Sequence, residues 1–344
     1  MIAILGGGVA GASLAWALAR AGHRQVTVFD PRPCGAGSTG RALGGFRTQH
    51  GSLLNTQLAL ASRPFYAELG ERVAFRATGY LYLAEDDGVA RDLAQRAETQ
   101  RAWGIPVEHP EPRSVAPFLE VEDVRGANFC RLDGVYLPAL VLDAFVEKAR
   151  EGGVRLRYGE EASPGALEAA EAVVVASGAW SQGVGGSLGV DLPVTPWERG
   201  VYQVGPFDWL NGAEPMVLEA GSGFHFRERE GRLLVMFPQA DGEGPHQWDR
   251  VRAWLARRVP KAAVGSFEAH WTGAYEMTPD HHPLVGATGR PGVWASCGFS
   301  GHGIMQAPAV AASLAAMILG LTPPLDISAL DPRRRVALVD STQL

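Results

Sequence analysis

A glycine-rich turn close to the first residue limits the possible folds of this chain more than any other feature. The segment GGGVAG, residues 6–11, follows the short apolar run MIAIL and opens the alanine- and leucine-rich segment VAGASLAWALARAG. Gly6, Gly8 and Gly11 have the spacing G-x-G-x-x-G, which permits a tight turn, close approach of a pyrophosphate, and contact between helix and strand. This order predicts a strand, a turn and a helix, with the phosphates of a dinucleotide at the helix start beside Val9 and Ala10.

An acidic residue ends the next predicted strand. The run QVTVFD has the apolar and β-branched composition of a strand, and its last residue, Asp30, lies nineteen positions after Gly11. A carboxylate at this place can accept hydrogen bonds from ribose hydroxyls. We therefore predict a dinucleotide site that includes Asp30 and the adjacent Pro31, and these residues alone do not distinguish NAD from FAD.

The segment CGAGSTGRALGGFRTQHG, residues 34–51, favours FAD. It is rich in glycine, polar, and contains two arginines. NAD-binding domains usually continue from the acidic residue into a helix, whereas a long polar segment suits a cofactor whose second ring system must be enclosed. The alternative is a mobile surface loop. The cofactor residues predicted here are Ser38, Thr39, Arg41, Ala42, Gly44 and Gly45.

Two later segments extend the same prediction. AEAVVVASGAWS predicts a strand over residues 173–175 and then small residues that let the backbone pass beneath a nucleotide, namely Ala176, Ser177 and Gly178, followed by Trp180. GVWASCGFSGHGIMQAPAV predicts a strand, a second glycine-rich turn and a long apolar helix. Free amides at the start of that helix would favour the negative charge that a flavin ring gains on reduction. The cofactor residues predicted in this turn are Gly298, Gly301, His302, Gly303, Ile304 and Met305.

As a set, six stretches resemble the FAD-dependent amine oxidoreductases of the D-amino-acid oxidase superfamily. They are GGGVAGASLAWALARAG, STGRALGGFR, ATGYLYLA, VVVASGAWS, WTGAYEMTPDHHPLVG and GFSGHGIMQAPAV. The branch with sarcosine oxidase, dimethylglycine dehydrogenase and the proline dehydrogenase β subunit is the most similar. The resemblance implies an α/β plus α+β fold. A Rossmann-like FAD-binding domain would comprise residues 1–75, 140–200 and 290–344. A discontinuous substrate domain, built on an antiparallel or mixed sheet, would comprise 76–139 and 201–289.

The resemblance also implies an enzyme that oxidises the C–N bond of a small amino acid or N-alkyl amino acid by hydride transfer to flavin N5. A substrate carboxylate calls for an arginine, and GGFR in this family points to Arg47. Tyr275 and His225 are the other predicted catalytic residues, and Gly273 lies beside the cofactor. Two alternatives stay open: Arg47 pairs with a structural acid or with FAD, and His225 is a core histidine bonded to backbone.

Two departures from the sarcosine oxidases refine these expectations. Gly273-Ala274 stands where those enzymes carry the cysteine that attaches the flavin, so we predict non-covalent FAD. Met305 replaces the lysine of their GFSGHGFK stretch, which makes strict sarcosine oxidase activity doubtful. The electron acceptor is expected to be oxygen or a redox partner. The alternative functions are a flavoprotein subunit of a multi-component amino-acid dehydrogenase and a flavin-binding module without turnover.

Composition excludes several other classes of function. The net charge of −6 over 344 residues gives no basic surface for nucleic acid, and the three cysteines lack the spacing of metal ligands, so no metal is expected. The apolar run APAVAASLAAMILGL is shorter than the roughly 20 residues that span a bilayer, so we expect no membrane span. The first strand begins at Met1 with no apparent signal peptide, which predicts a cytoplasmic location. The tail DPRRRVALVDSTQL is expected to pack loosely on the surface.

Overall fold

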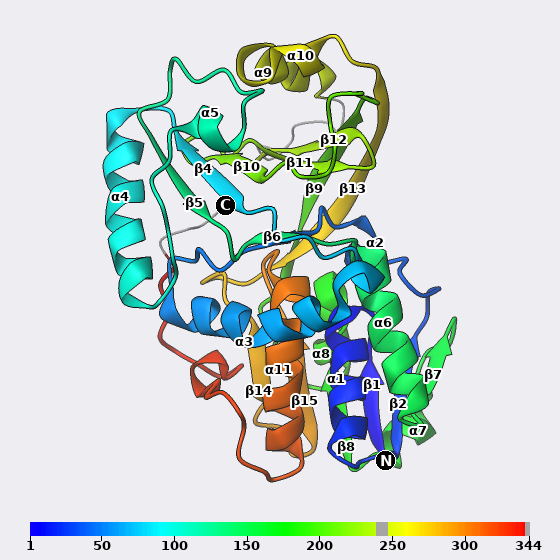
Figure 1. The fold of residues 1–344 in the computed structure, drawn as a ribbon. Coiled ribbons are helices and arrows are strands. Elements are labelled where there is room, and N and C mark those ends of the chain that lie inside the picture. Colours follow the sequence, from blue (N-terminus) through cyan, green and yellow to red (C-terminus); the bar gives the residue numbers. More distant parts are fainter. Residues whose placement is uncertain (239–246, 341–344) are drawn as a thin grey trace.

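The structure is a computed structural model that describes residues 1–238 and 247–340. Figure 1 shows two parts stacked on each other, each built around one large sheet. The N-terminal strand lies in the lower sheet of this view, and the long helix near the C-terminus packs beside it. This arrangement confirms the predicted combination of a Rossmann-like part with a second, sheet-based part.

The lower sheet has six strands in the order β14-β15-β8-β1-β2-β7. β1 pairs in parallel with β2 and β8, and Ile4 stands opposite both Val28 and Val174. Every residue of β2 and β8 is buried, as expected for parallel strands covered on both faces. The edge strand β14 is antiparallel to β15. The bounds are β1 Ile2–Leu5, β2 Val26–Asp30, β7 Arg155–Tyr158, β8 Ala172–Val175, β14 Leu284–Ala287 and β15 Val293–Cys297.

The upper sheet has seven strands in the order β13-β9-β12-β11-β10-β4-β5. It is mixed, because β10 runs parallel to β4 while the other neighbouring pairs are antiparallel. Its strands are β4 Tyr80–Ala84, β5 Gly126–Cys130, β9 Thr195–Val204, β10 Met216–Glu219, β11 His225–Arg229, β12 Arg232–Met236 and β13 Phe267–Met277. A separate antiparallel pair joins β3 Gly45–Phe46 to β6 Gly134–Val135.

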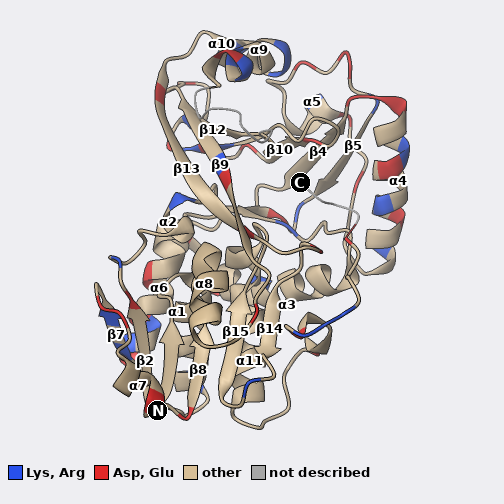
Figure 2. Cartoon of the chain, turned by 180° about the vertical axis from the view of Figure 1, so that it is seen from behind, with Lys and Arg blue, Asp and Glu red and all other residues tan. Residues whose placement is uncertain are grey.

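Apolar helices cover the lower sheet, whereas charged helices lie on the outside. α11 contains no charged residue and packs against α1 and α3. Figure 2 shows both signs of charge gathered on α4, at the edge of the molecule. No helix within residues 1–238 and 247–340 is long and apolar enough to cross a membrane. The helices are α1 Val9–Arg20, α2 Ser38–Arg41, α3 Leu53–Leu69, α4 Asp87–Ala102, α5 Pro112–Val115, α6 Pro138–Glu151, α7 Pro164–Glu168, α8 Ser181–Ser187, α9 Trp248–Arg258, α10 Pro260–Ala263 and α11 Gly303–Ile318.

Two long strands of the upper sheet, β9 and β13, extend to the lower part and contact it. β13 pairs with β9 along almost its whole length, and α2 lies against β13. The Ser38 hydroxyl donates to the carbonyl of Ala274 at 2.6 Å, and the Trp271 indole donates to the carbonyl of Arg41 at 3.0 Å. Residues 38–41 thus form α2 and residues 45–46 form β3, and the alternative of a mobile surface loop is not supported.

The division of the chain into two domains stays a prediction. The boundary predicted at residue 200 falls inside β9, which belongs to the upper sheet. The boundary predicted at residue 290 falls after β14, which pairs with β15 in the lower sheet. The chain therefore passes from one sheet to the other a few residues before each of these two predicted boundaries.

The prediction of a loosely packed C-terminal tail fits the exposed Val336 and Val339 but is wrong for Arg334, Leu338 and Asp340. Arg334 forms an ion pair with Asp280 at 2.6 Å, and the backbone N–H of Leu338 donates to the same carboxylate at 3.1 Å. Asp340 is 6% exposed and accepts hydrogen bonds from the Gly51 N–H and the Asn55 side chain. Polar groups far away in the sequence hold the tail, so its composition alone could not reveal the contacts.

Candidate active site

Two cavities meet where the upper and lower sheets face each other. The first, here called the nucleotide cavity, is lined by the β1–α1 turn and by the residues after β2 and β8. The second, called the central cavity, lies between the start of α11 and the upper sheet. Both cavities are lined by Val9, Ser38, Thr39 and Glu276, so they form one continuous depression. The predicted site residues can be placed against these two cavities.

Glycine is required twice in the β1–α1 turn. Gly6 has φ +115°, and a Cβ there would lie 2.2 Å from the carbonyl oxygen of Ala176. A Cβ at Gly11 would lie 1.9 Å from the carbonyl oxygen of Gly6. The turn therefore packs backbone against backbone, as the motif predicts. α1 begins at Val9, and its N-cap residue, Gly8, has no side chain to cap it, which leaves the amides that follow Val9 for a ligand.

Asp30 supports the same turn. Its carboxylate accepts the Gly7 N–H at 2.9 Å and the Arg32 N–H at 3.0 Å. Thr39 reaches the turn from the other side and accepts the Val9 N–H at 3.1 Å. The guanidinium of Arg32 stacks 3.8 Å from the centre of the half-exposed Trp180 ring. Also lining the nucleotide cavity are the predicted residues Gly6, Gly8, Ala10, Ala176, Ser177 and Gly178.

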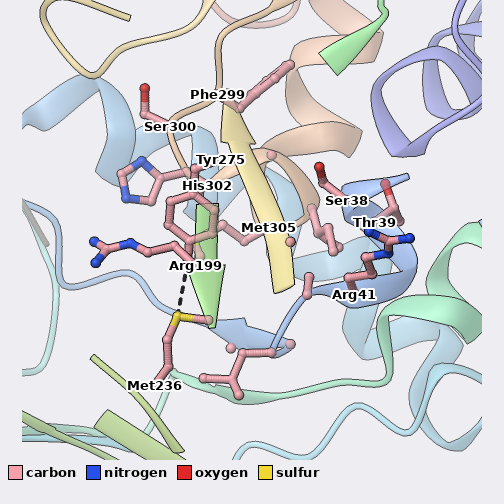
Figure 3. Close-up of a pocket in the computed structure, with 18 of the residues that line it drawn as sticks. Ser38, Thr39, Arg41, Arg199, Met236, Tyr275, Phe299, Ser300, His302 and Met305 are labelled. Atoms are coloured by element: carbon pink, nitrogen blue, oxygen red, sulfur yellow. Dashed lines mark hydrogen bonds between the residues drawn. The ribbon is translucent and has the colours of Figure 1, made fainter. Parts of the chain in front are cut away.

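The second glycine-rich turn packs against an aromatic ring of the upper sheet. Gly301 has φ +88°, and a Cβ there would lie 2.5 Å from the Tyr275 ring. α11 follows at Gly303 and has no side-chain cap, so a second helix start is open beside the central cavity. Figure 3 shows Tyr275 in this cavity with His302 and Met305, and its hydroxyl lies 3.6 Å from the Met236 sulfur. Other predicted residues that line this cavity are Arg41, Ala42, Gly44, Gly45, Gly273, Gly303 and Ile304.

Arg47 is a buried cation in the wall of the central cavity. It is 1% exposed and donates to the Tyr82 hydroxyl at 2.9 Å, to His302 Nε2 at 2.8 Å, and weakly to the Gln49 carbonyl. No carboxylate lies within 4.0 Å of it among residues 1–238 and 247–340. Burial acts to lower the pKa of Arg47, but Tyr82, Tyr80 and Asp340 act in the opposite direction and outweigh it. The pKa is therefore raised above its usual value, and the side chain stays charged. The alternative of a structural ion pair is not supported in the described part of the chain.

Two neutral histidines flank this arginine. A guanidinium can only donate, so Nε2 of His302 accepts and the proton of that ring resides on Nδ1. Burial, followed by the charge of Arg47, lowers the pKa of His302 to about 3. His50 packs edge-on against His302 with ring centres 5.2 Å apart, and its pKa is also lowered, first by burial. Arg47 is therefore the cation of this group at neutral pH.

His225 lies on β11, where it is bonded to backbone and also lines the central cavity. Its Nδ1 lies 2.9 Å from the Gly223 carbonyl and must donate to it, which leaves a lone pair on Nε2. The side chain is buried and lines the central cavity. Burial lowers the pKa of His225 to about 4, and the Gly223 bond only partly opposes this. The ring is thus a neutral hydrogen-bond acceptor held by backbone at the cavity wall.

The structure adds cavity residues that the sequence did not single out. Arg199 lies on β9 with its guanidinium 3.7 Å from the Trp197 ring centre, and β9 stands opposite β13 in the sheet. Glu276 accepts the Gly298 N–H at 2.8 Å, and burial raises its pKa to about 7. Of these two residues, only Glu276 could have been suspected from the sequence, because it directly follows the predicted site residue Tyr275. Further lining residues are Tyr80, Tyr136, Val201, Met216, Met236 and Asp340.

Three predicted cofactor residues line neither cavity. Gly11 serves the contact between helix and strand, Pro31 follows β2 beside the cavity, and Gly298 packs under the second turn. A Cβ at Gly298 would lie 2.4 Å from the Thr278 side chain, and its φ is +73°. Gly11 and Gly298 shape the two turns, and the predicted cofactor contacts of these three positions stay predictions.

The sequence profile of DAO, described as FAD dependent oxidoreductase, matches residues 1–317. The chain belongs to this family. Among curated proteins it is 28% identical over 377 residues to a glycine oxidase of Pseudomonas putida, covering 97% of this chain and 99% of that protein. It is 25% identical over 374 residues to 4-methylaminobutanoate oxidase (formaldehyde-forming) of Paenarthrobacter nicotinovorans, covering 96% of this chain but 45% of that protein. The chain thus spans less than half the length of that relative.

Solved structures agree with the family assignment. The L-proline dehydrogenase from P. horikoshii has a TM-score of 0.89 and 26% identity, covering 97% of this chain and 96% of that one. The glycine oxidase from Geobacillus kaustophilus has a TM-score of 0.85 and 25% identity, covering 97% of this chain and 98% of that one. The two cavities also suit the cofactor of this family. The starts of α1 and α11 open on them, and neither N-cap residue caps its helix with a side chain, so one start suits phosphates and the other an electron-rich ring edge.

Proposed function

We propose that the chain oxidises the C–N bond of a small amino acid or N-alkyl amino acid with non-covalently bound FAD. The observation that carries this proposal is Arg47, a fully buried cation beside the central cavity with no carboxylate within 4.0 Å in the described part. A buried charge without a counterion is costly, so an anionic ligand would complete this site. A substrate carboxylate matches the fork of a guanidinium.

The cofactor would extend from one helix start to the other. The pyrophosphate would bind at Gly8–Ala10, the ribose at Asp30, and the flavin ring between Gly301–Met305 and the upper sheet. When bound, FAD supplies the acceptor for the hydride that leaves the substrate carbon. Cys34, Cys130 and Cys297 line neither cavity, which supports attachment without a cysteine bond.

The protein side chains would orient the substrate and keep its amine neutral. Arg47 would hold the carboxylate, while Tyr82 and His302 keep the guanidinium in place. The Nε2 lone pair of His225 would accept an N–H from the amine and would not retain the proton, because its pKa is about 4. Two buried arginines, Arg47 and Arg199, also favour the neutral amine over the ammonium, since like charges repel. Tyr275, Met216 and Met236 would form the apolar wall.

An anaerobic screen of amino acids and N-methyl amino acids tests this function. The expected result is that at least one compound bleaches the flavin absorbance of the purified holoenzyme, and that Arg47→Met slows this bleaching by about a hundredfold or more while FAD stays bound. If no compound in a broad panel reduces the flavin, the catalytic proposal is wrong and a flavin-binding module without turnover remains.

The second candidate is the flavoprotein subunit of a multi-component dehydrogenase. The similarity to an L-proline dehydrogenase along 97% of the chain favours it. The two candidates differ in the reaction of the reduced flavin: an oxidase reoxidises rapidly in air, whereas a dehydrogenase subunit reoxidises slowly in air and rapidly with an artificial dye. Rapid-mixing measurements of both reactions on the substrate-reduced protein decide between them.

A further inference from the structure

Asp133 is a buried carboxylate next to the segment that carries Arg47. It is 0% exposed and lies directly before β6, whose partner β3 directly precedes Arg47. One of its oxygens accepts both the backbone N–H and the hydroxyl of Thr48, each at 2.6 Å. The other oxygen accepts the Gln49 side-chain amide at 3.0 Å. The two residues that follow Arg47 are thus both bound to this one carboxylate.

These bonds continue to the arginine itself. The Gln49 amide also donates to the Tyr80 carbonyl at 3.1 Å, which ties the segment to β4. The backbone carbonyl of Gln49 in turn accepts a weak hydrogen bond from Arg47 at 3.4 Å. The hydroxyl of Tyr82, which also lies on β4, accepts a second hydrogen bond from Arg47 at 2.9 Å. A shift of Thr48 and Gln49 would therefore move the guanidinium relative to the central cavity.

The surroundings of Asp133 show that these hydrogen bonds are its main support. No cation lies within 4.0 Å of it among the residues described. Burial raises the pKa of Asp133 to about 6, while the bonds from Thr48 and Gln49 and the charge of Arg47 act in the opposite direction. The other titratable groups facing it are Cys130, Tyr80 and Tyr82, whose pKa values are all raised, chiefly by burial. Among these side chains, Asp133 is thus the group that changes charge near pH 6.

We propose that Asp133 is a positioning residue for carboxylate binding: its ionised form holds Thr48 and Gln49 so that Arg47 faces the central cavity, and its protonation weakens binding of the anion. The inference rests on the proposed role of Arg47. A protonated Asp133 loses an acceptor for one of its three donors, so the segment after β3 loosens. Asp133 touches neither the substrate nor the cofactor in this scheme.

The test measures binding rather than turnover. Propionate, and propionamide as its uncharged counterpart, are titrated into the oxidised holoenzyme by calorimetry. Asp133→Asn keeps the shape of the side chain but presents an N–H₂ group to the Gln49 amide. The dissociation constant of propionate should therefore rise about tenfold at pH near 8, whereas the dissociation constant of propionamide should stay unchanged. Asp123→Asn removes a carboxylate elsewhere in the upper part, at the ion pairs with Arg257 and Arg258, and should leave both constants unchanged.

The pH dependence separates positioning from a general loss of structure. In the wild type, propionate binding should weaken as the pH falls through about 6, and the loss should level off at about tenfold, the loss expected for the uncharged Asn side chain. His50 and His302 do not contribute, because both are already neutral in this range. Burial raises the pKa of Glu276 in the same cavity to about 7, and its loss of charge on acidification would favour the anion instead of weakening its binding; Glu276 is present in both proteins, so the difference between wild type and Asn variant reports on Asp133. The Asn variant should show no such change. Thr48→Val removes one of the three bonds and gives a smaller loss, about threefold, should the Asn variant not fold.

Two outcomes would overturn these ideas separately. If Arg47→Met loses propionate binding while Asp133→Asn and Thr48→Val retain both the affinity and the pH dependence of the wild type, the role of Asp133 is wrong and that of Arg47 stands. If Arg47→Met binds propionate normally, the proposed function fails at its anchoring residue, and the inference about Asp133 fails with it.

Discussion

The nucleotide cavity and the central cavity join in one depression, yet they are built in different ways. The nucleotide cavity is made mainly from residues 6–10 and 30–39 and from the turn after β8, with glycines packed on backbone. The central cavity is lined by single residues from α2, β3, several strands of the upper sheet, α11 and the tail. Its wall contains buried charges, among them Arg47 and Arg199. The comparison teaches that backbone geometry shapes one end, whereas side-chain chemistry shapes the other.

The largest effect should come from adding a side chain to the nucleotide cavity. Gly6→Val places atoms about 2.2 Å from a carbonyl oxygen at a φ that valine rarely adopts, so we expect a loss of at least about 3 kcal/mol in unfolding free energy and no bound FAD. The matched control is Gly183→Ala in α8, where a Cβ meets nothing within 4 Å. Thermal unfolding and flavin content measure both. A yellow, stable Gly6→Val protein would contradict the difference between the cavities.

A substitution in the central cavity should instead lower activity and leave the fold intact. Arg47→Met should lower kcat/KM by about a hundredfold to a thousandfold, since removal of a buried charged partner typically costs about 3–4 kcal/mol. FAD should stay bound, because Arg47 has no part in the phosphate-binding turn. Arg47→Lys keeps the charge but not the fork, and should recover only part of the activity. Equal activity of the Met variant and the wild type would remove the central observation of the proposed function.

A smaller effect is expected at His225. His225→Phe removes the Nε2 acceptor and should reduce the limiting rate of flavin reduction by about tenfold to a hundredfold. His225→Gln can still accept a hydrogen bond and should lose less. Anaerobic rapid-mixing kinetics with any substrate found in the screen provide the measurement. A rate of flavin reduction unaffected by both variants would mean that the histidine is only a core residue bonded to Gly223.

The smallest effect concerns the tail, whose Asp340 lines the central cavity. Arg334 holds the pKa of Asp280 well below its usual range, in opposition to burial. A carboxylate with a lowered pKa stabilises the fold fully above its unfolded value near 4, and this contribution is lost as the pH falls below it. Arg334→Gln should therefore cost about 1–2 kcal/mol at neutral pH and flatten the acid part of the stability curve. Urea unfolding at several pH values shows whether it does.

Local pattern predicted the lower part of the fold well. β1, α1, β2, β8 and β15 lie where the runs MIAIL, VAGASLAWALARAG, QVTVFD, AVVV and GVWAS predicted them. These strands are buried on both faces, and their helices are amphipathic or wholly apolar, so each residue pattern allows one arrangement. The prediction for the tail missed the hydrogen bonds of three of its residues, because those bonds depend on Asp280, Gly51 and Asn55 from other elements.

The sequence by itself determined the family, the glycine-rich turn between β1 and α1, and the arginine of the central cavity, because these depend on short segments whose glycines or flanking residues have a fixed local conformation. Only the tertiary structure decided that Arg199, Glu276 and Asp340 line the same cavity, and that Asp133 lies behind Arg47. The physical reason is that strand pairing and helix packing bring together residues far apart along the chain, so the burial and the hydrogen bonds of each side chain depend on neighbours that its own segment does not contain.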